Sequence, residues 1–277
     1  MKRIMTIQDV SCVGKCSLTV ALPVISAAGV ETSIMPTTVL STHTQFDKFT
    51  FRDLTDEIQP ISDTLYELGI DFDAIYTGYL GSFEQLERVS DFIDRFGKDA
   101  KVIIDPAMGD NGVLYKGFVP EFALAMAKLC AKADLIIPNM TEAAYMLGIP
   151  YVTEYDEAYV RDLLKKLVGL GAKSAALTGI SLEEGKIGVY SYDSERDSYY
   201  YYANVKLPMV YHGTGDVYAS ATVGALMRGF STEEALKIAV DFTLKSMEKT
   251  MEDPNPRFYG VNFEEALPYY IELLSGK

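Results

Sequence analysis

Short apolar runs alternate with longer amphipathic segments along most of the chain. Runs of about five residues rich in β-branched side chains predict buried strands, and segments whose apolar residues recur every three or four positions predict helices. Strands are predicted at residues 2–7, 31–39, 73–78, 101–105, 134–138 and 174–179, and helices at residues 17–29, 61–69, 83–97, 120–132 and 158–171. This alternation indicates βαβ units, and therefore a doubly wound α/β fold with a mostly parallel sheet between two layers of helices.

Two further features complete this pattern. Residues 186–190 and 198–207 read as strands separated by a polar turn, which predicts an antiparallel hairpin at one edge of the sheet. A later amphipathic helix has a capping box, because Ser231 precedes Glu234 by three positions. We find no linker and no internal repeat, so we expect one three-layer α/β/α domain over residues 1–277. In such sheets, ligands bind beyond the carboxyl ends of the strands.

Composition narrows the function and the compartment. The chain has 277 residues, of which 48% are hydrophobic, and a formal net charge of −14. This charge disfavours a general binder of nucleic acids, although backbone amides can still hold one small anion. No apolar run reaches the roughly 20 residues that span a bilayer, and the N-terminus lacks a signal-peptide pattern. The odd number of cysteines, Cys12, Cys16 and Cys130, favours reduced thiols in the cytoplasm over a redox pair of Cys12 and Cys16.

A glycine-rich corner precedes one of the predicted helices. Gly213, Thr214, Gly215 and Asp216 stand between an irregular stretch and a segment of small and apolar residues that ends near Gly229. The two glycines allow backbone angles and close approaches that other residues do not. The first turn of the helix presents unpaired N–H groups and the positive end of the helix dipole, where an anion fits. Asp216 is either the N-cap of this helix or a carboxylate that acts beside the anion.

Polar residues follow two of the predicted strands. Asp105 and Asp110 come after one strand, and Asn139 and Glu142 come after the next. Mg²⁺ prefers oxygen ligands and usually takes only one or two carboxylates together with phosphates and waters. Asp110 and Glu142 are therefore candidates for a magnesium site beside a nucleotide. The alternative for Asn139 and Glu142 is a structural role as the N-cap and third residue of a helix.

These features together predict phosphoryl transfer. Amides of residues 213–215 neutralise the moving phosphoryl group, and a metal ion bridges the phosphates of the nucleotide. Asp216 is the candidate base that accepts the proton of the attacking hydroxyl group.

A competing motif, the phosphate-binding P-loop, is excluded. The stretch VGKCS at residues 13–17 resembles the end of that motif. The full pattern requires a glycine at position 9 and Ser or Thr at position 16. The chain has Asp9 and Cys16 at these positions.

Five segments of the chain, taken in their order along the sequence, match the motifs of a known family. They are IMTIQDVSCVGKCSLTVALPVISAAGVETSIMPTTVLSTHTQF from residue 4, TGYLGS from residue 77, DPAMGD from residue 105, IIPNMTEA from residue 136 and GTGD from residue 213. In this order they resemble the pyridoxal (vitamin B6) kinases of the ribokinase-like superfamily. GTGD is shared across the superfamily, whereas the early Ile-Gln pair and STHTQ at residues 41–45 point to the vitamin B6 branch. The resemblance covers nearly the whole chain and implies a ribokinase-like fold without a separate lid domain.

The resemblance implies transfer of the ATP γ-phosphate to the 5′-hydroxyl group of pyridoxal, pyridoxamine or pyridoxine, with Mg²⁺. By matching position, Asp216 is the catalytic base, and Gly213, Thr214 and Gly215 form the anion hole. The other implied positions are Asp105, Asn139, Glu142 and Thr178 for the nucleotide, Asp110 and Glu142 for the metal, and Asp9, Thr44, Gln45, Tyr79 and Asp216 for the vitamer. The family also implies a homodimer, and a monovalent cation such as K⁺ is a further candidate cofactor.

Two departures from the family pattern leave other substrates open. Asp9 stands where many members have Ser, and His212 replaces a more usual apolar residue. A carboxylate at position 9 suits a protonated ring nitrogen or an amine of the ligand. Hydroxymethylpyrimidine kinases share the fold and the GTGD corner and are the nearest alternative. Sugar kinases come next, but their N-terminal Gly-Gly segment and β lid are missing from residues 10–50. A protein that only binds its ligands is disfavoured, because binding does not require Asp216.

Overall fold

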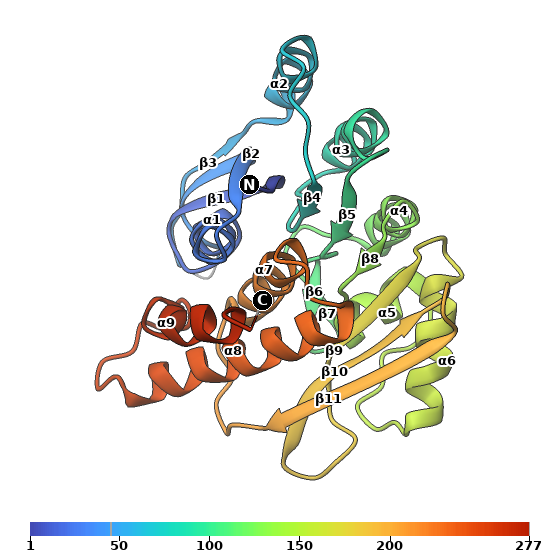
Figure 1. Ribbon diagram of the computed structural model, residues 1–277, viewed down its shortest axis with the longest axis vertical. Helices are drawn as coiled ribbons and strands as arrows, with labels where there is room; N and C mark the ends of the chain where they lie inside the picture. The colour runs from blue at the N-terminus through green and yellow to red at the C-terminus, as the bar shows by residue number, and fades with distance from the viewer. Residues whose placement is uncertain (45, 277) are drawn as a thin grey trace. The chain divides into compact units, whose positions relative to one another are not determined.

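A computed structural model describes residues 1–44 and 46–276 (Figure 1). The chain divides into two compact units: Met1–Tyr76 together with Leu207–Lys277 form the first, and Thr77–Lys206 forms the second. The expectation of a single domain over residues 1–277 stays a prediction. No described helix combines the length and the hydrophobicity needed to cross a membrane.

The first unit contains a sheet whose strands run in the order β4-β1-β2-β3. Its strands are β1 (Arg3–Val13), β2 (Glu31–Thr42), β3 (Phe51–Asp53) and β4 (Ala74–Thr77), of which only Thr77 belongs to the second unit. β1 and β2 are long and parallel, whereas the short β3 is antiparallel to β2. The register of β1 and β2 shifts between Gln8 and Val10, so the ladder is interrupted at Asp9. An irregularity of this kind changes the direction of a side chain, and the residue at this position is Asp9.

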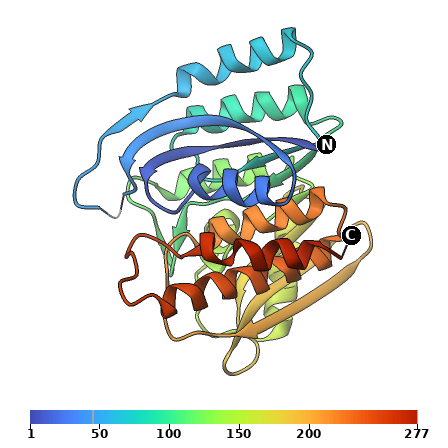
Figure 2. The ribbon, with the colours of Figure 1, turned by 60° about the vertical axis from the view of Figure 1, so that its left-hand side comes forward.

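Five helices belong to the described part of the first unit, and three of them pack together around α7. The helices are α1 (Leu18–Ala27), α2 (Thr55–Glu67), α7 (Thr214–Met227), α8 (Thr232–Glu252) and α9 (Phe263–Leu274). α1 lies along β1 and β2, while α7 contacts α1, α8 and α9 (Figure 2). α7 is buried on all sides from Val217 to Leu226, which explains its apolar composition. Gly224 lets α9 approach, because a Cβ there would lie 2.3 Å from the Tyr270 hydroxyl oxygen.

The second unit contains a mixed sheet with strand order β5-β8-β9-β10-β11. Its strands are β5 (Lys101–Ile104), β8 (Leu135–Ile136), β9 (Ser174–Ile180), β10 (Lys186–Asp193) and β11 (Ser198–Val205). β5, β8 and β9 are parallel, and β10 and β11 continue the sheet as an antiparallel hairpin at its edge. A separate small hairpin is formed by β6 (Gly109–Asp110) and β7 (Val113–Leu114).

The helices of the second unit pack mainly on its strands and on one another. They are α3 (Phe83–Phe96), α4 (Pro120–Cys130), α5 (Met140–Leu147) and α6 (Glu157–Val168). α5 contacts β9 and the β6 strand, and α6 contacts β9 and β10. Along the chain, β5 is followed by β6, and β8 is followed by α5. β6 carries Asp110, and α5 carries Glu142.

The predicted alternation of strands and helices and the edge hairpin are confirmed, as is the capping box of Ser231 and Glu234 at the start of α8. α1 begins after Ser17 as expected and continues through Pro23. α2 begins at Thr55 rather than at residue 61. The apolar pattern did not single out α9, and the strands β3, β6 and β7 are too short to show a periodicity.

Candidate active site

The bulge in the first sheet places Asp9 among buried polar groups. Asp9 is 5% exposed, and Ser11 donates a hydrogen bond from Oγ to Asp9 Oδ2 over 3.3 Å. The side chain of Ser17 also hydrogen-bonds to this carboxyl group. Burial raises the pKa of Asp9 above its ordinary value, and the two hydroxyl groups oppose that effect.

The glycine-rich corner forms the N-terminus of α7. Gly213 is the N-cap residue, with φ of 75°, and no side chain caps the helix. The interpretation of Asp216 as the N-cap is therefore wrong, because the cap lies three residues earlier. A Cβ on Gly213 would lie 2.0 Å from the Lys15 carbonyl oxygen, so only glycine fits this position. Gly215 is exposed and has open space around it. An anion can therefore approach the main chain of the first turn at Gly215.

Asp216 stands in that first turn. The residue is half-buried, and desolvation of its carboxyl group raises the pKa to about 7. The charge of Asp9 raises the pKa of Asp216 further, while a hydrogen bond from the backbone N–H of Ser17 lowers it. Asp9, Ser17 and Asp216 together form what we call the Asp216 centre. Ser17 was not among the predicted site residues, because its position before an apolar helix indicated only a helix start.

Cys16 lies beside the Asp216 centre. Burial, followed by the charges of Asp216 and Asp9, raises the pKa of the Cys16 thiol well above its usual range. The thiol therefore remains protonated and is a weak nucleophile. Cys12 is exposed and Cys130 is buried, and all three cysteines are free.

The segment after β2 packs in an aromatic cluster with a segment near the C-terminus. The ring of His43 lies 5.2 Å from Phe46 and 6.2 Å from Tyr259, and its Nε2 is 3.2 Å from the Tyr259 carbonyl oxygen. Thr44 is exposed beside this cluster. Gln45 lies outside the described residues, so its predicted role in binding the vitamer stays a prediction, as does that of Thr44.

In the second unit, Asn139 and Glu142 form a capping box at the start of α5. Glu142 N–H donates to Asn139 Oδ1 over 2.9 Å, and Asn139 N–H donates to Glu142 Oε2 over 2.8 Å. The structural alternative for this pair is therefore confirmed. The other carboxylate oxygen of Glu142 accepts the N–H of Met108 over 3.2 Å. Despite these bonds, burial raises the pKa of Glu142 to about 8, and the charge of Asp110 adds to this effect.

The β6–β7 hairpin brings Asp110 close to Glu142. Its turn residues Asn111 and Gly112 have φ of 50° and 80°, the values that a two-residue hairpin turn needs. Gly112 N–H donates to Thr141 Oγ1 over 2.9 Å, and Asn139 Nδ2 donates to the Gly109 carbonyl oxygen over 2.8 Å. Two hydrogen bonds from the first turn of α5 thus fix the hairpin that exposes Asp110.

Asp105 and Thr178 belong to the same neighbourhood. Burial raises the pKa of the Cys130 thiol, and the charges of Glu142 and Asp105 raise it further. Thr178 N–H donates to the Pro138 carbonyl oxygen over 3.0 Å, and Thr178 forms a parallel bridge with Asn139. We call Asp105, Asp110, Asn139, Glu142 and Thr178 the Glu142 centre.

Tyr79 takes part in a different arrangement. Its ring packs at 5.4 Å from that of Phe118, which in turn stacks on Phe122 of α4 at 4.3 Å. Its predicted role in stacking on a ligand ring stays a prediction.

The donor set of the Glu142 centre suits a magnesium ion. Within residues 1–44 and 46–276, no group of three or more His, Cys, Asp or Glu side chains is arranged to hold a metal. Mg²⁺ bound with nucleotide phosphates needs only one or two carboxylates, however. Asp110 and the desolvated Glu142 supply two. A nearby cation would also favour the charged form of Glu142, which burial disfavours.

The α/β fold and the Asp216 centre together define a class of enzyme. Free amides at a helix N-terminus bind and neutralise a phosphoryl group, and a neighbouring carboxylate with a pKa near neutrality accepts a proton. These are the requirements of a phosphotransferase acting on an alcohol.

The chain belongs to the phosphomethylpyrimidine kinase family, whose model matches residues 22–256. Among its relatives, it is 30% identical over 219 residues to the pyridoxine kinase of Bacillus subtilis, covering 77% of this chain and 76% of that one. It is 28% identical over 274 residues to the pyridoxal kinase PdxY of Pasteurella multocida, covering 92% and 91% of the two chains.

Solved structures extend the similarity to the whole fold. A Bacteroides thetaiotaomicron protein, provisionally assigned as a phosphomethylpyrimidine kinase and crystallised with pyridoxal, is 38% identical with a TM-score of 0.92, covering 97% of this chain and 95% of that one. The pyridoxal kinase of Lactobacillus plantarum is 29% identical with a TM-score of 0.91, covering 99% and 98%. The predicted α/β fold, with its mostly parallel sheet and antiparallel edge hairpin, is thus confirmed, and so is the resemblance to the pyridoxal kinases.

Proposed function

We propose that this protein phosphorylates the 5′-hydroxymethyl group of a vitamin B6 vitamer, pyridoxal, pyridoxamine or pyridoxine, with ATP as phosphoryl donor. One observation carries the proposal: Asp216, whose carboxyl pKa is raised to about 7, stands in the first turn of α7, directly after the glycine corner. The pyridoxal-bound structure of the relative at 38% identity supports the choice of vitamer.

In the proposed reaction, Asp216 in its ionised form accepts the proton of the vitamer hydroxyl group as that oxygen attacks the γ-phosphorus. The bond between the γ-phosphorus and the β,γ-bridging oxygen of ATP breaks, and ADP leaves. A base with a pKa near the working pH is well suited to this task. The amides of Gly213, Thr214 and Gly215 stabilise the negative charge on the transferring group. Asp9 hydrogen-bonds to a ring nitrogen or an amine of the vitamer.

The Glu142 centre serves the nucleotide. Asp110 and Glu142 hold Mg²⁺, directly or through water, and Asp105, Asn139 and Thr178 contact ATP. Mg²⁺, when bound, neutralises charge on the phosphates. We further expect a cytoplasmic homodimer, with a monovalent cation such as K⁺ as an additional cofactor. Size-exclusion chromatography with light scattering tests the dimer, and activity in K⁺ against Na⁺ tests the cation.

Phosphorylation of hydroxymethylpyrimidine is the second candidate, because the family model that matches residues 22–256 carries that description. A coupled assay of ATP consumption with pyridoxal, pyridoxamine, hydroxymethylpyrimidine and ribose separates the candidates. We expect the highest kcat/KM with a B6 vitamer. A higher kcat/KM with the pyrimidine would replace the first proposal by the second, and activity on ribose alone would contradict both.

A further inference from the structure

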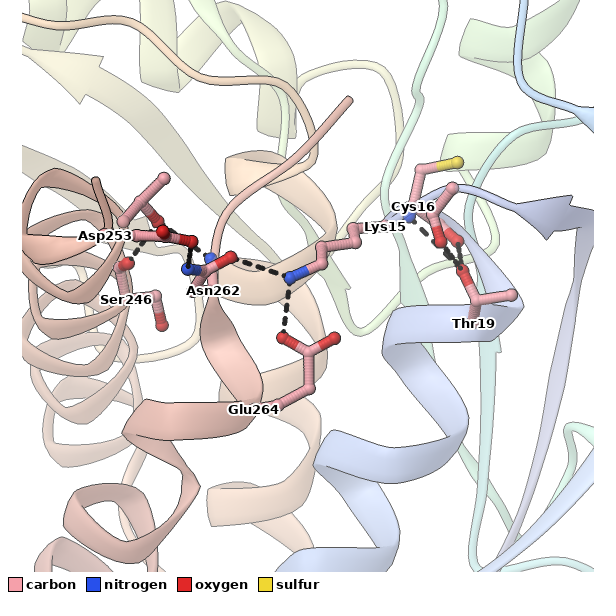
Figure 3. Close-up of polar contacts among 9 residues, drawn as sticks. Lys15, Cys16, Thr19, Ser246, Asp253, Asn262 and Glu264 are labelled. Atoms are coloured by element: carbon pink, nitrogen blue, oxygen red, sulfur yellow. Dashed lines mark hydrogen bonds and ion pairs between the residues drawn. The ribbon is translucent and has the colours of Figure 1, made fainter. Parts of the chain in front are cut away.

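The side chain of Lys15, in the stretch that resembles a P-loop, binds residues at the start of α9. Lys15 Nζ donates to Asn262 Oδ1 and to Glu264 Oε2, each over 2.9 Å (Figure 3). The Lys15 side chain is only 15% exposed, whereas that of Glu264 is 52% exposed. The ammonium group therefore connects the turn after β1 to the start of α9, which lies almost the whole chain length away in sequence.

Asn262, which accepts a hydrogen bond from Lys15, is itself held by further hydrogen bonds. Asn262 N–H donates to Thr250 Oγ1 over 2.8 Å, and Thr250 Oγ1 donates to the Ser246 carbonyl oxygen over 2.7 Å within α8. Asn262 Nδ2 donates to Asp253 Oδ2 over 3.0 Å (Figure 3). Asn262 thus presents its side-chain oxygen to Lys15 from a site that is buried and fixed on α8.

The main chain and stem of Lys15 are also enclosed. The Lys15 carbonyl oxygen occupies the space that a Cβ on Gly213 would need, and the Lys15 Cβ would lie 2.4 Å from a Cβ on Gly260. On the α1 side, the Thr19 hydroxyl group lies within hydrogen-bonding distance of two carbonyl oxygens, those of Gly14 at 3.0 Å and of Cys16 at 2.7 Å. Residues 14–16 of the turn therefore contact α1 through Thr19, the glycine corner through Gly213 and the C-terminal segment through Gly260.

The residue at the end of this turn has a strained backbone. Ser17 has φ of 48° and ψ of −130°, a conformation that non-glycine residues rarely adopt. Such a conformation persists only where the surrounding structure holds it. Here it lets one residue reach two carboxyl groups, Asp9 through its side chain and Asp216 through its backbone N–H.

We propose that Lys15 is a positioning residue, whose contacts with Asn262 and Glu264 hold the 14–17 turn in the strained conformation that places Ser17 against Asp9 and Asp216. Lys15 does not touch the reacting groups. It acts through Ser17 and through its own carbonyl oxygen, which packs against Gly213. The inference rests on the proposed role of Asp216 as the base.

The test compares Lys15→Met, which keeps the stem but removes the charge, with Lys15→Arg and with the control Lys2→Met. Lys2 also forms an ion pair in the first unit, with Asp73 over 2.6 Å, but its side chain is 58% exposed. We expect kcat of Lys15→Met to fall about 10- to 100-fold, as for a small misplacement of a reacting group, with little change in the KM for ATP. Lys15→Arg restores part of the loss, and Lys2→Met behaves as the wild type.

A second readout does not depend on activity. In ¹³C NMR of carboxyl-labelled aspartate, with Asp216→Asn to assign the signal, the pKa of Asp216 should rise in Lys15→Met because the Ser17 amide moves away. The charge of Asp9 on β1 acts on Asp216, and the charge of Asp216 acts on the Cys16 thiol in the turn; neither Asp9 nor Cys16 is replaced in Lys15→Met. If the wild type phosphorylates none of the four substrates, the proposed function fails while this titration still tests the positioning role.

An unchanged titration of Asp216 in Lys15→Met would overturn the inference, as would a loss of turnover that matches the loss of folded protein. If Lys15→Met does not fold, Glu264→Gln takes its place, since it removes the ion pair and leaves Asn262. We expect the same changes to a smaller extent. No change in either readout for Glu264→Gln would then count against the positioning role.

Discussion

Asp216 and Glu142 are both carboxylates whose burial raises their pKa, to about 7 and about 8, yet they are held in different ways. Glu142 accepts the backbone N–H groups of Asn139 and Met108, one on each carboxylate oxygen. Outside its own residue, the backbone donor that acts on Asp216 is the N–H of Ser17, which lies in a strained turn. Each carboxylate also has an acidic neighbour, Asp9 or Asp110, that raises its pKa further.

This difference fits the two roles proposed above, a capping and metal-holding carboxylate for Glu142 and a base for Asp216. Glu142 closes a capping box and anchors a hairpin, so its protonation state is tied to the local fold. No side chain caps α7, and the pKa of Asp216 depends on groups that a ligand or a small shift of the turn can change. The proposed base therefore has a pKa that its surroundings can change, whereas the proposed metal ligand is held by fixed backbone hydrogen bonds.

The largest expected effect comes from Asp216→Asn. Turnover should fall by about 10² to 10⁴, the usual contribution of a general base, while ATP affinity measured by calorimetry stays nearly unchanged. The matched variant Glu142→Gln should instead raise the Mg²⁺ concentration needed for half-maximal rate. If Asp216→Asn keeps wild-type turnover, Asp216 is not the base and the contrast between the two carboxylates disappears.

A smaller effect on stability is expected from Gly213→Ala compared with Gly112→Ala. Both glycines have positive φ, 75° and 80°, so alanine costs about 1–2 kcal/mol at either site from backbone strain alone. At position 213 the new Cβ also meets the Lys15 carbonyl oxygen, whereas at position 112 it meets the ring of Tyr151, which can rotate away. Urea unfolding should therefore show a larger loss for Gly213→Ala, and equal losses would mean that the turn around Lys15 yields easily.

Local patterns predicted the parts of both centres that lie close together in sequence. The glycine corner before α7 and the capping box of Asn139 and Glu142 could be read from four consecutive residues each, because helix starts depend on local hydrogen bonds. The Asn-Gly pair at residues 111–112 is also a local hairpin signal, and it could have revealed the β6–β7 hairpin.

Contacts between distant segments could not be predicted in this way. Lys15 meets Asn262 and Glu264 across 247 and 249 positions of sequence, and nothing near Lys15 indicates those partners. The strain of Ser17 is equally hidden, because a serine before an apolar helix normally indicates an ordinary N-cap. The bulge that turns Asp9 toward the site depends on the pairing of β1 with β2 and is absent from the sequence of β1 alone.

The smallest expected effect is a shift in pH dependence when the acidic neighbours are removed. Turnover should rise with pH as Asp216, whose pKa is raised to about 7, becomes ionised. Asp9→Asn removes a negative charge that raises this pKa, so the rise in kcat should move to lower pH. Asp110→Asn, measured at saturating Mg²⁺, should leave the midpoint unchanged, because Asp110 raises the pKa of Glu142 instead. An equal shift in both variants, or a shift only in Asp110→Asn, would show that the carboxylate titrating in kcat is not Asp216.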